Sequence, residues 1–188
     1  MCEKLKDYCS SLIGEVPHDV YVMLLITFCA GTVMAIGLKG WRRGLRLSLF
    51  FLLIEYIFLL YGSTVLFRDT MRELKYNFTP FWSYVEIANG DKTGLLTENV
   101  MNVIMFVPVG FLLGCAFRFI KWWQVLIIGI GLSVLIEVLQ YLSCRGFSEF
   151  DDIMHNTLGC MIGYMMIQFF CVKRVLDERN RKGSVDIL

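Results

Sequence analysis

Five long apolar runs constrain this chain more than any other feature of its sequence. Each has the roughly 17 to 25 residues that a helix needs to cross about 30 Å of hydrocarbon. Because 56% of the 188 residues are hydrophobic and only 19% are charged, a soluble domain could not bury so much apolar surface. We therefore expect an all-α, multi-pass membrane protein with five transmembrane helices. They are predicted near Val20–Leu38, Leu45–Leu66, Val100–Ile120, Trp123–Leu142 and Ile153–Val172.

The distribution of Lys and Arg predicts the orientation of these helices, since positive charge near helix ends stays in the cytoplasm. Eleven of the 18 basic residues fall in short segments on one alternating side, and seven are spread over longer segments on the other. The N-terminus is therefore predicted outside and the C-terminus inside. This divides the chain into an extracytoplasmic segment (1–19), a transmembrane domain (20–172) and a basic cytoplasmic tail (173–188). The first apolar run follows four acidic residues, unlike a signal peptide, so we interpret it as a spanning helix.

Net charge and cysteine spacing argue against several function classes. The formal net charge is only +1, and the basic segments are explained by topology, so no nucleic-acid partner is predicted. The seven cysteines form no C-x-x-C pair and no metal-ligand spacing. A D-D-x-x-H pattern ends at His155, but the other histidine, His18, is at the far end of the sequence. We therefore expect neither a cofactor nor a metal.

The long segment between the second and third runs is predicted to form a structured outer loop. Residues 67–75 place apolar side chains at 67, 71 and 74 with charges between them, which favours a short helix in the membrane interface. Pro80 ends that helix, because proline lacks a backbone donor and disfavours a helical residue before it. The aromatic side chains that follow are of the kind that anchors at headgroup level. We interpret the segment as a cap over the outer face, with a passive loop as the alternative.

Polar side chains inside the apolar runs mark the candidate site, because such groups are costly at membrane depth. At helical spacing they form one stripe in each of the last three runs, and all three stripes become polar near the predicted outer ends. Glycines on two of the stripes let helices approach closely. We therefore expect the stripes to meet in the outer leaflet. They are Asn99, Asn102, Phe106 and Gly110; Ser133, Glu137 and Gln140; and Asp152, Asn156, Gly159 and Gly163.

The hairpin at 143–152 follows the fourth run and separates two adjacent acids by role. Ser148 and Asp151 fit the S-x-x-D capping box, so Asp151 is interpreted as a cap of the fifth helix. Asp152 is turned onto the Asn156 face and is a site candidate. Arg145 is the cation that would neutralise Glu137 or Asp152, or would hold an anionic ligand.

Glu55 lies near the middle of the second run, where a carboxylate needs a hydrogen-bonding partner at matching depth. Ser133 and Thr32 are the expected partners. We favour a packing or assembly role for Glu55, and proton-coupled transport is the alternative.

Two long motifs carry a family resemblance. The first reads Asn99-Val-Met-Asn102-Val-Ile-Met-Phe106-Val-Pro108-Val-Gly110, and the second reads Asp151-Asp152-x-x-x-Asn156-Thr157-Leu158-Gly159-x-x-x-Gly163-Tyr164. With Asn77-x-x-Pro80-Phe81, Glu137-x-x-Gln140 and Arg145, they resemble the VanZ-like membrane protein family over residues 60–166. The resemblance implies a small helical protein of the bacterial plasma membrane. Its name-giving members are associated with low-level resistance to teicoplanin-type glycopeptides.

Three functional classes remain open. A binding protein would hold a lipid headgroup or a lipid-linked cell-wall precursor, or the glycopeptide itself, through Asn77, Asn102, Gln140, Arg145 and Asn156. An intramembrane enzyme would use Glu137 as general acid or base together with Asp152. A transporter or flippase would use Glu55. The simplest alternative is that the polar side chains only join three helices, since such bonds are common between membrane helices. The oligomeric state stays open.

Overall fold

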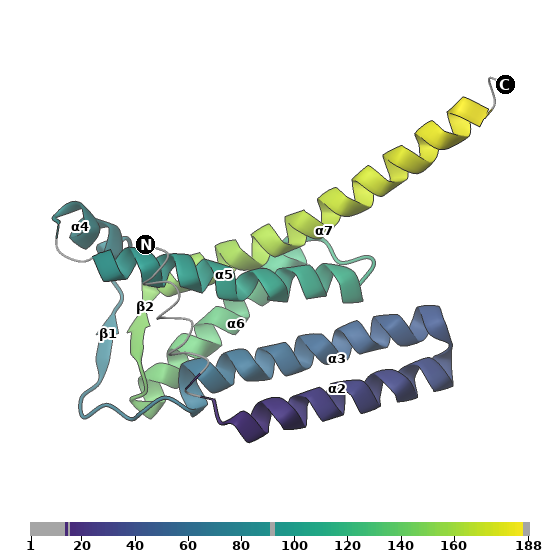
Figure 1. The fold of residues 1–188 in the computed structure, drawn as a ribbon. Helices are drawn as coiled ribbons and strands as arrows, with labels where there is room; N and C mark the ends of the chain where they lie inside the picture. The colour runs from purple at the N-terminus through teal and green to yellow at the C-terminus, as the bar shows by residue number, and fades with distance from the viewer. Residues whose placement is uncertain (1–13, 15, 91–92, 186–188) are drawn as a thin grey trace.

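The computed structural model describes residue 14, residues 16–90 and residues 93–185, with side chains for all of these except Arg42, Thr93 and residues 171–185. Long helices run side by side, and two short strands and a short helix gather at one end of them (Figure 1). The turns between α2 and α3 and between α5 and α6 lie at the opposite end. In chain order the elements are α2 (His18–Lys39), α3 (Trp41–Tyr61), the π-helical turn η1 (Gly62–Leu66), β1 (Lys75–Asn77), α4 (Trp82–Ala88), α5 (Thr93–Ala116), α6 (Trp122–Ser143), β2 (Phe147–Glu149) and α7 (Phe150–Val185).

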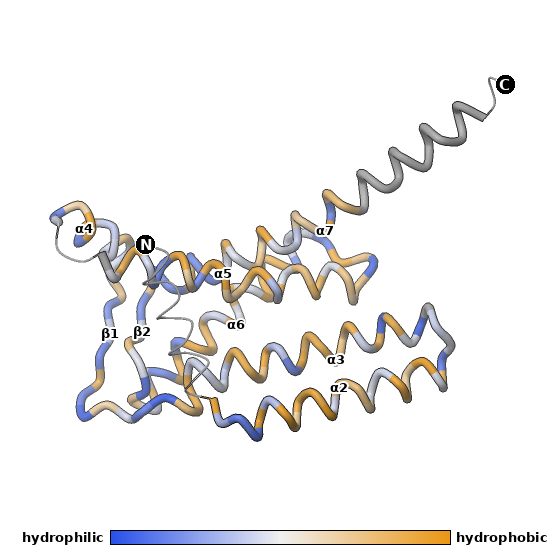
Figure 2. Tube along the Cα trace, viewed as in Figure 1, coloured by the Kyte–Doolittle hydropathy of each residue, from blue (hydrophilic) through white to orange (hydrophobic). Residues whose placement is uncertain are grey.

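Four of the described helices are long and apolar enough to cross a membrane, at His18–Lys39, Arg43–Leu66, Gly94–Ala116 and Trp122–Ser143. They confirm four of the five predicted spans. Figure 2 shows apolar residues along α2, α3, α5 and α6 and hydrophilic residues near β1 and β2. α7 covers the predicted fifth span, and a fifth crossing and the outside–inside orientation stay predictions. Most of segment 1–19 and the basic side chains of tail 173–188 lie outside the described residues and side chains.

The third spanning helix begins and ends earlier than predicted. α5 starts at Thr93. Its first turns are polar, and a search for apolar runs therefore does not detect them. It ends at Ala116, and the Phe117 and Ile120 backbone N–H groups complete the turn by bonding the carbonyls of Leu113 and Phe117. The earlier start brings Glu98 and Asn99 onto the helix.

Close packing of α5 against α7 depends on small residues, as the sequence predicts. A Cβ added at Gly110 would overlap the carbonyl oxygen of Cys160, and one added at Gly159 would overlap that of Val103. Backbone therefore lies against backbone along this helix pair. This approach places the polar residues of the α5 and α7 stripes within hydrogen-bonding distance of each other.

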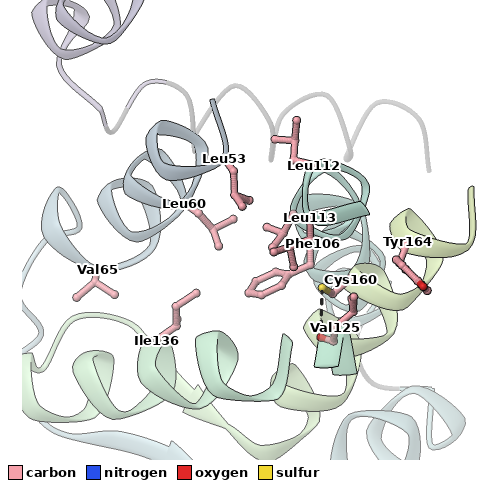
Figure 3. Close-up of a cluster of buried hydrophobic side chains, with 11 residues drawn as sticks. Leu53, Leu60, Val65, Phe106, Leu112, Leu113, Val125, Ile136, Cys160 and Tyr164 are labelled. Atoms are coloured by element: carbon pink, nitrogen blue, oxygen red, sulfur yellow. Dashed lines mark hydrogen bonds between the residues drawn. The ribbon is translucent and has the colours of Figure 1, made fainter. Parts of the chain in front are cut away.

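An apolar core joins α3, α5, α6 and α7. Phe106 of α5 is 1% exposed and lies at its centre. Figure 3 shows Leu53 and Leu60 of α3 turned toward Phe106, with Ile136 of α6 on another side. α2 packs mainly against α3 and takes no part in this cluster. The core thus holds α5, α6 and α7 as a unit below the polar end.

The predicted interfacial helix at residues 67–75 is wrong. Residues 67–74 form bends and irregular backbone, and β1 then pairs in parallel with β2 in the register Tyr76 to Ser148. The Met71 backbone N–H also donates to the carbonyl oxygen of Cys144 at 2.7 Å. Because a distant hairpin satisfies these backbone groups, the segment gains no advantage from local helical bonds. The prediction of a structured loop is confirmed, since β1 and α4 both lie in it.

Candidate functional site

A polar cavity of about 440 Å³ lies at the β1–β2 end of the bundle. Residues from the segment after η1, from α5, α6 and β2, and from the start of α7 form its wall. Four carboxylates, one guanidinium and two amides are among them. The lining residues are Thr64, Arg68, Asp69, Thr70, Met71, Glu98, Asn102, Met105, Gln140, Gly146, Phe147, Glu149 and Asp152.

Asn102 and Asp152, both predicted as site residues, meet across the α5–α7 contact. The Asn102 Nδ2 atom donates to the Asp152 Oδ1 atom at 2.6 Å, and both residues line the cavity. Asn156, one turn further along α7, donates instead to the Ser133 hydroxyl of α6 at 2.9 Å. Asn156 is therefore brought close to the predicted site, but its amide joins α7 to α6 and does not line the cavity.

Gln140 is 5% exposed and has one amide atom without a partner in the described structure. Its Nε2 atom donates to the carbonyl oxygen of Thr64 at 3.2 Å, whereas its Oε1 atom accepts no hydrogen bond. The approach of this side chain depends on Gly146, whose φ is +100° and where an added Cβ would lie 3.2 Å from Gln140 Nε2 and 2.7 Å from Arg68 Nη1. This oxygen has almost no exposed surface, so it is an unsatisfied acceptor enclosed in the wall and not open to the cavity.

Glu149 is a buried carboxylate of the cavity that sequence reasoning missed. Its side chain accepts a hydrogen bond from the Trp82 indole Nε1 atom at 3.1 Å. Burial, followed by the negative charge of Asp152, raises the pKa of Glu149 to about 8. A signal for Glu149 was present in the sequence. In a strand over residues 147–149, Phe147 and Glu149 would share one face and Ser148 would lie on the other.

Glu137 is buried, as its helical face predicts, but it does not line the cavity. Its Oε2 atom accepts a hydrogen bond from the backbone N–H of Glu149 at 2.8 Å. The carboxylate thus holds β2 in place behind the cavity wall. In this arrangement Glu137 positions Glu149 and does not face the empty volume.

The cation that lines the cavity is Arg68, not Arg145. The Arg145 guanidinium donates to the backbone carbonyl of Leu66, and Arg145 is absent from the cavity wall. The sequence predicts Arg68 in an interfacial helix, but its segment is irregular and the Arg68 guanidinium lies beside Gly146. The expectation that Arg145 neutralises Glu137 or Asp152 is therefore wrong, because its guanidinium binds the Leu66 carbonyl instead.

Asp151 is structural, as predicted, but it does not serve as a cap of its own helix. It is 0% exposed and accepts hydrogen bonds from the Phe81 N–H at 2.6 Å, the Ser83 N–H at 3.0 Å and the Ser83 hydroxyl at 2.6 Å. These bonds cap the first turn of α4, whose N-cap Phe81 has a left-handed backbone with φ of 61°. The predicted capping box with Ser148 is wrong because both oxygens of Asp151 are bound to α4.

Asn77 and Glu55 also have partners other than the expected ones. Asn77 Oδ1 accepts the backbone N–H of Thr79 at 3.0 Å, which forms a local turn outside the cavity wall. The Thr27 hydroxyl of α2 donates to Glu55 Oε1 at 2.7 Å. The expected partner Ser133 is bound by Asn156, so Glu55 joins α3 to α2, away from the polar cavity.

The His155 side chain is hydrogen-bonded to a tyrosine. Its Nε2 atom lies 2.7 Å from the hydroxyl oxygen of Tyr84, on α4. Among the described residues, no group of three or more His, Cys, Asp or Glu side chains is arranged to hold a metal ion. The contact adds to the attachment of α4 to α7.

The cavity favours a ligand that donates hydrogen bonds. The carboxyl groups of Asp69, Glu98, Glu149 and Asp152 are acceptors, and Arg68 supplies the positive charge. Amines and hydroxyls fit the acceptors, and an acidic oxygen fits the guanidinium.

These features define a multi-pass helical membrane protein with a polar cavity at one end of its bundle. The chain belongs to the VanZ/LLP1 family, whose model matches residues 47–171. It is similar to Protein VanZ of Enterococcus faecium, with 30% identity over 95 residues. That alignment covers 48% of this chain and 59% of the Enterococcus protein, so the chain spans less than two thirds of the relative's length. No solved structure matches the chain.

Proposed function

We propose that the protein binds the polar headgroup of a lipid, or of a lipid-linked cell-wall precursor, in its polar cavity, and that this binding lowers susceptibility to teicoplanin-type glycopeptides. The observation that carries the proposal is the wall of the cavity, which brings the Arg68 guanidinium, the Asp152 carboxylate and the Asn102 amide to one volume. A headgroup with both an amine and an acidic oxygen would pair with the two charges. Membership of a family linked to teicoplanin resistance supports the biological role.

The wall chemistry narrows the ligand class. Four carboxylates beside one guanidinium suit a headgroup that bears an amine together with an acidic or phosphate oxygen, or one rich in hydroxyls. A volume of about 440 Å³ is in the range of small-molecule sites. Lipid chains would stay outside, along the apolar flanks of α5 and α6. The glycopeptide itself is the alternative ligand.

An enzyme that modifies the same headgroup is the second candidate, and the observation that favours it is the paired carboxylates of Glu149 and Asp152 in the cavity. Of these, Glu149 has its pKa raised to about 8, which suits a general acid near neutral pH. Glu137 is the general acid or base expected from the sequence. It would then position Glu149 by accepting the hydrogen bond of the Glu149 backbone N–H. Transport through Glu55 has less support, because its partner Thr27 lies on α2.

The test uses Asp152→Asn, which removes the charge and leaves an oxygen that can still accept the Asn102 amide. We expect cells that express this variant to lose tolerance to teicoplanin at unchanged protein levels, because a charge-assisted contact to the ligand is gone. Glu73→Gln, an exposed acid of the same outer segment that does not line the cavity, is the matched control. Equal tolerance of both variants and wild type would contradict a role for the cavity.

Mass analysis of lipid-linked precursors separates the two candidates. A binder leaves the precursors chemically unchanged in cells that express wild-type protein. A precursor that is modified only when wild-type protein is present, and is unmodified with Glu149→Gln, would replace the binding proposal with the enzyme.

A further inference from the structure

Two further cavities lie at the opposite end of the bundle, beside the turns from α2 to α3 and from α5 to α6. Their volumes are about 520 Å³ and 490 Å³, and both are lined by Arg46, Ala116 and Phe117. Because they share these three residues, the two cavities adjoin, and we treat them together. We call them the basic groove.

The groove is strongly cationic. Lys39, Arg43 and Arg46 line one part of it, and Arg46 and Arg118 line the other. The sequence contains no Asp or Glu in residues 39–50 or 116–128, the two stretches that form the wall. Four positive side chains therefore face one volume whose wall carries no negative side chain, which makes an anion the complementary ligand.

The floor of the groove is apolar. Phe50 of α3 and Phe117 meet edge to face with ring centroids 5.7 Å apart, and Ile128 of α6 lines the neighbouring part. Phe50 is 37% exposed and Phe117 is 43% exposed. An inorganic anion would leave this surface uncovered, whereas an acyl chain would cover it.

Exposed tryptophans place the groove at the depth of lipid headgroups. Trp41 begins α3 and is 70% exposed, and Trp122 and Trp123 begin α6 and are 60% and 45% exposed. Such rings gather at the boundary between hydrocarbon and water. The partial positive charge at the starts of α3 and α6 lies at the same end and adds to the attraction for phosphate.

We propose that the basic groove binds an anionic phospholipid, with its phosphate held by Arg43, Arg46 and Arg118 and its acyl chain lying against Phe50 and Phe117. Basic pockets between the cytoplasmic ends of transmembrane helices bind acidic headgroups in this way. The proposal is independent of the polar cavity, which lies at the other end of the molecule.

The test is native mass spectrometry of the full chain in detergent, with phosphatidylglycerol or phosphatidylcholine of identical acyl chains. We expect wild type to retain at least about tenfold more of the anionic lipid, since its headgroup has a net negative charge, whereas the choline cation offsets the phosphate charge of phosphatidylcholine. The triple variant Arg43→Gln, Arg46→Gln, Arg118→Gln should bring that ratio close to one. The control is Arg72→Gln with Lys75→Gln, which removes two exposed positive charges from the outer segment and should keep the preference.

Two further arms keep the outcome decisive. Arg46→Gln alone changes a residue shared by both cavities, and it should lower the preference several-fold even if the triple variant fails to fold. Millimolar inorganic phosphate should leave the lipid bound. Equal retention of the two lipids by wild type, an unchanged preference in Arg46→Gln, or displacement of the lipid by phosphate would each overturn the proposal.

Discussion

Replacing Asp151 with Ala should loosen α4 without unfolding the helix bundle. Asp151 connects the start of α7 to the outer segment through three hydrogen bonds to Phe81 and Ser83. Phe81 is held in a left-handed conformation that an L-residue with a large side chain adopts rarely. Without the carboxylate, two backbone donors lose their acceptor and the strained turn loses its support.

The size of the effect follows from these bonds. Hydrogen bonds to a charged group contribute roughly 1.5–3 kcal/mol each, and neighbouring bonds to one carboxylate are not additive. Because Phe81 is 53% exposed, water replaces part of what is lost. We therefore expect the opening of α4 to become easier by about 2–4 kcal/mol, which is roughly a 30- to 1,000-fold change in the opening equilibrium. Asp151→Asn should have about half the effect, because its NH₂ group cannot accept from a backbone donor.

Hydrogen exchange of the α4 amides measures this opening directly. Exchange in α4 (Trp82–Ala88) should accelerate by the stated factor in Asp151→Ala, while exchange in the apolar middle of α5 should stay unchanged. Glu73→Gln serves as the exposed acidic control. Exchange in α4 at the wild-type rate in Asp151→Ala would refute the capping role, and a uniform acceleration in every helix would show a global fold defect instead.

Three more predictions concern packing, pH and topology. Gly159→Ala should destabilise the protein by at least about 2 kcal/mol in thermal unfolding, because its Cβ would overlap the Val103 carbonyl, whereas Gly131→Ala has open space and should be neutral. The free energy of unfolding should fall as the pH rises from about 4.5 to about 8, because folded Glu149 keeps its proton over the range in which the unfolded carboxyl loses it; a Glu149→Gln variant that retains the full pH slope would disprove this. In a cysteine-free background, a membrane-impermeant thiol reagent added to intact cells should label a cysteine placed at Glu73 and spare one placed at Lys121, and the reverse pattern would invert the predicted orientation.

The helical part of the site could be predicted because helix geometry is local. The spacing of Asn99, Asn102 and Phe106 fixes their common face without knowledge of the rest of the fold. Small residues at Gly110 and Gly159 identify where two helices touch. Together these two signals were sufficient to bring Asn102 of α5 to Asp152 of α7, a contact that the structure contains.

The non-helical part could not be predicted, because its conformation is set by partners far away in the sequence. Arg68 lines the cavity because its segment is not helical, and the pairing of β1 with β2 fixes the end of that segment. The backbone N–H groups that donate to Asp151 lie about 70 positions earlier in the chain. The local sequence signal was the capping box of Ser148 and Asp151. In the structure, Asp151 instead makes the long-range bonds to Phe81 and Ser83.

Glu55 shows a third kind of limit, that of rotation between helices. Hydropathy places α2 and α3 in the membrane, but the rotation of each about its axis is set by packing. Thr27 and Thr32 lie on different sides of α2, and the structure selects Thr27. Depth alone therefore gave two candidate partners, Ser133 on α6 and Thr32 on α2, and neither is the residue that binds Glu55.

Direct ligand binding to the purified chain tests the central claim that the polar cavity holds a headgroup. The measurement is the affinity of the full protein in nanodiscs for a lipid-linked cell-wall precursor, compared with Asp152→Asn and with the Glu73→Gln control. Loss of a charge-assisted contact should weaken binding by roughly 10- to 150-fold in Asp152→Asn and leave Glu73→Gln like wild type. Binding that is equally strong in all three proteins, or absent from wild type both for the precursor and for amine-bearing phospholipids, would contradict the account.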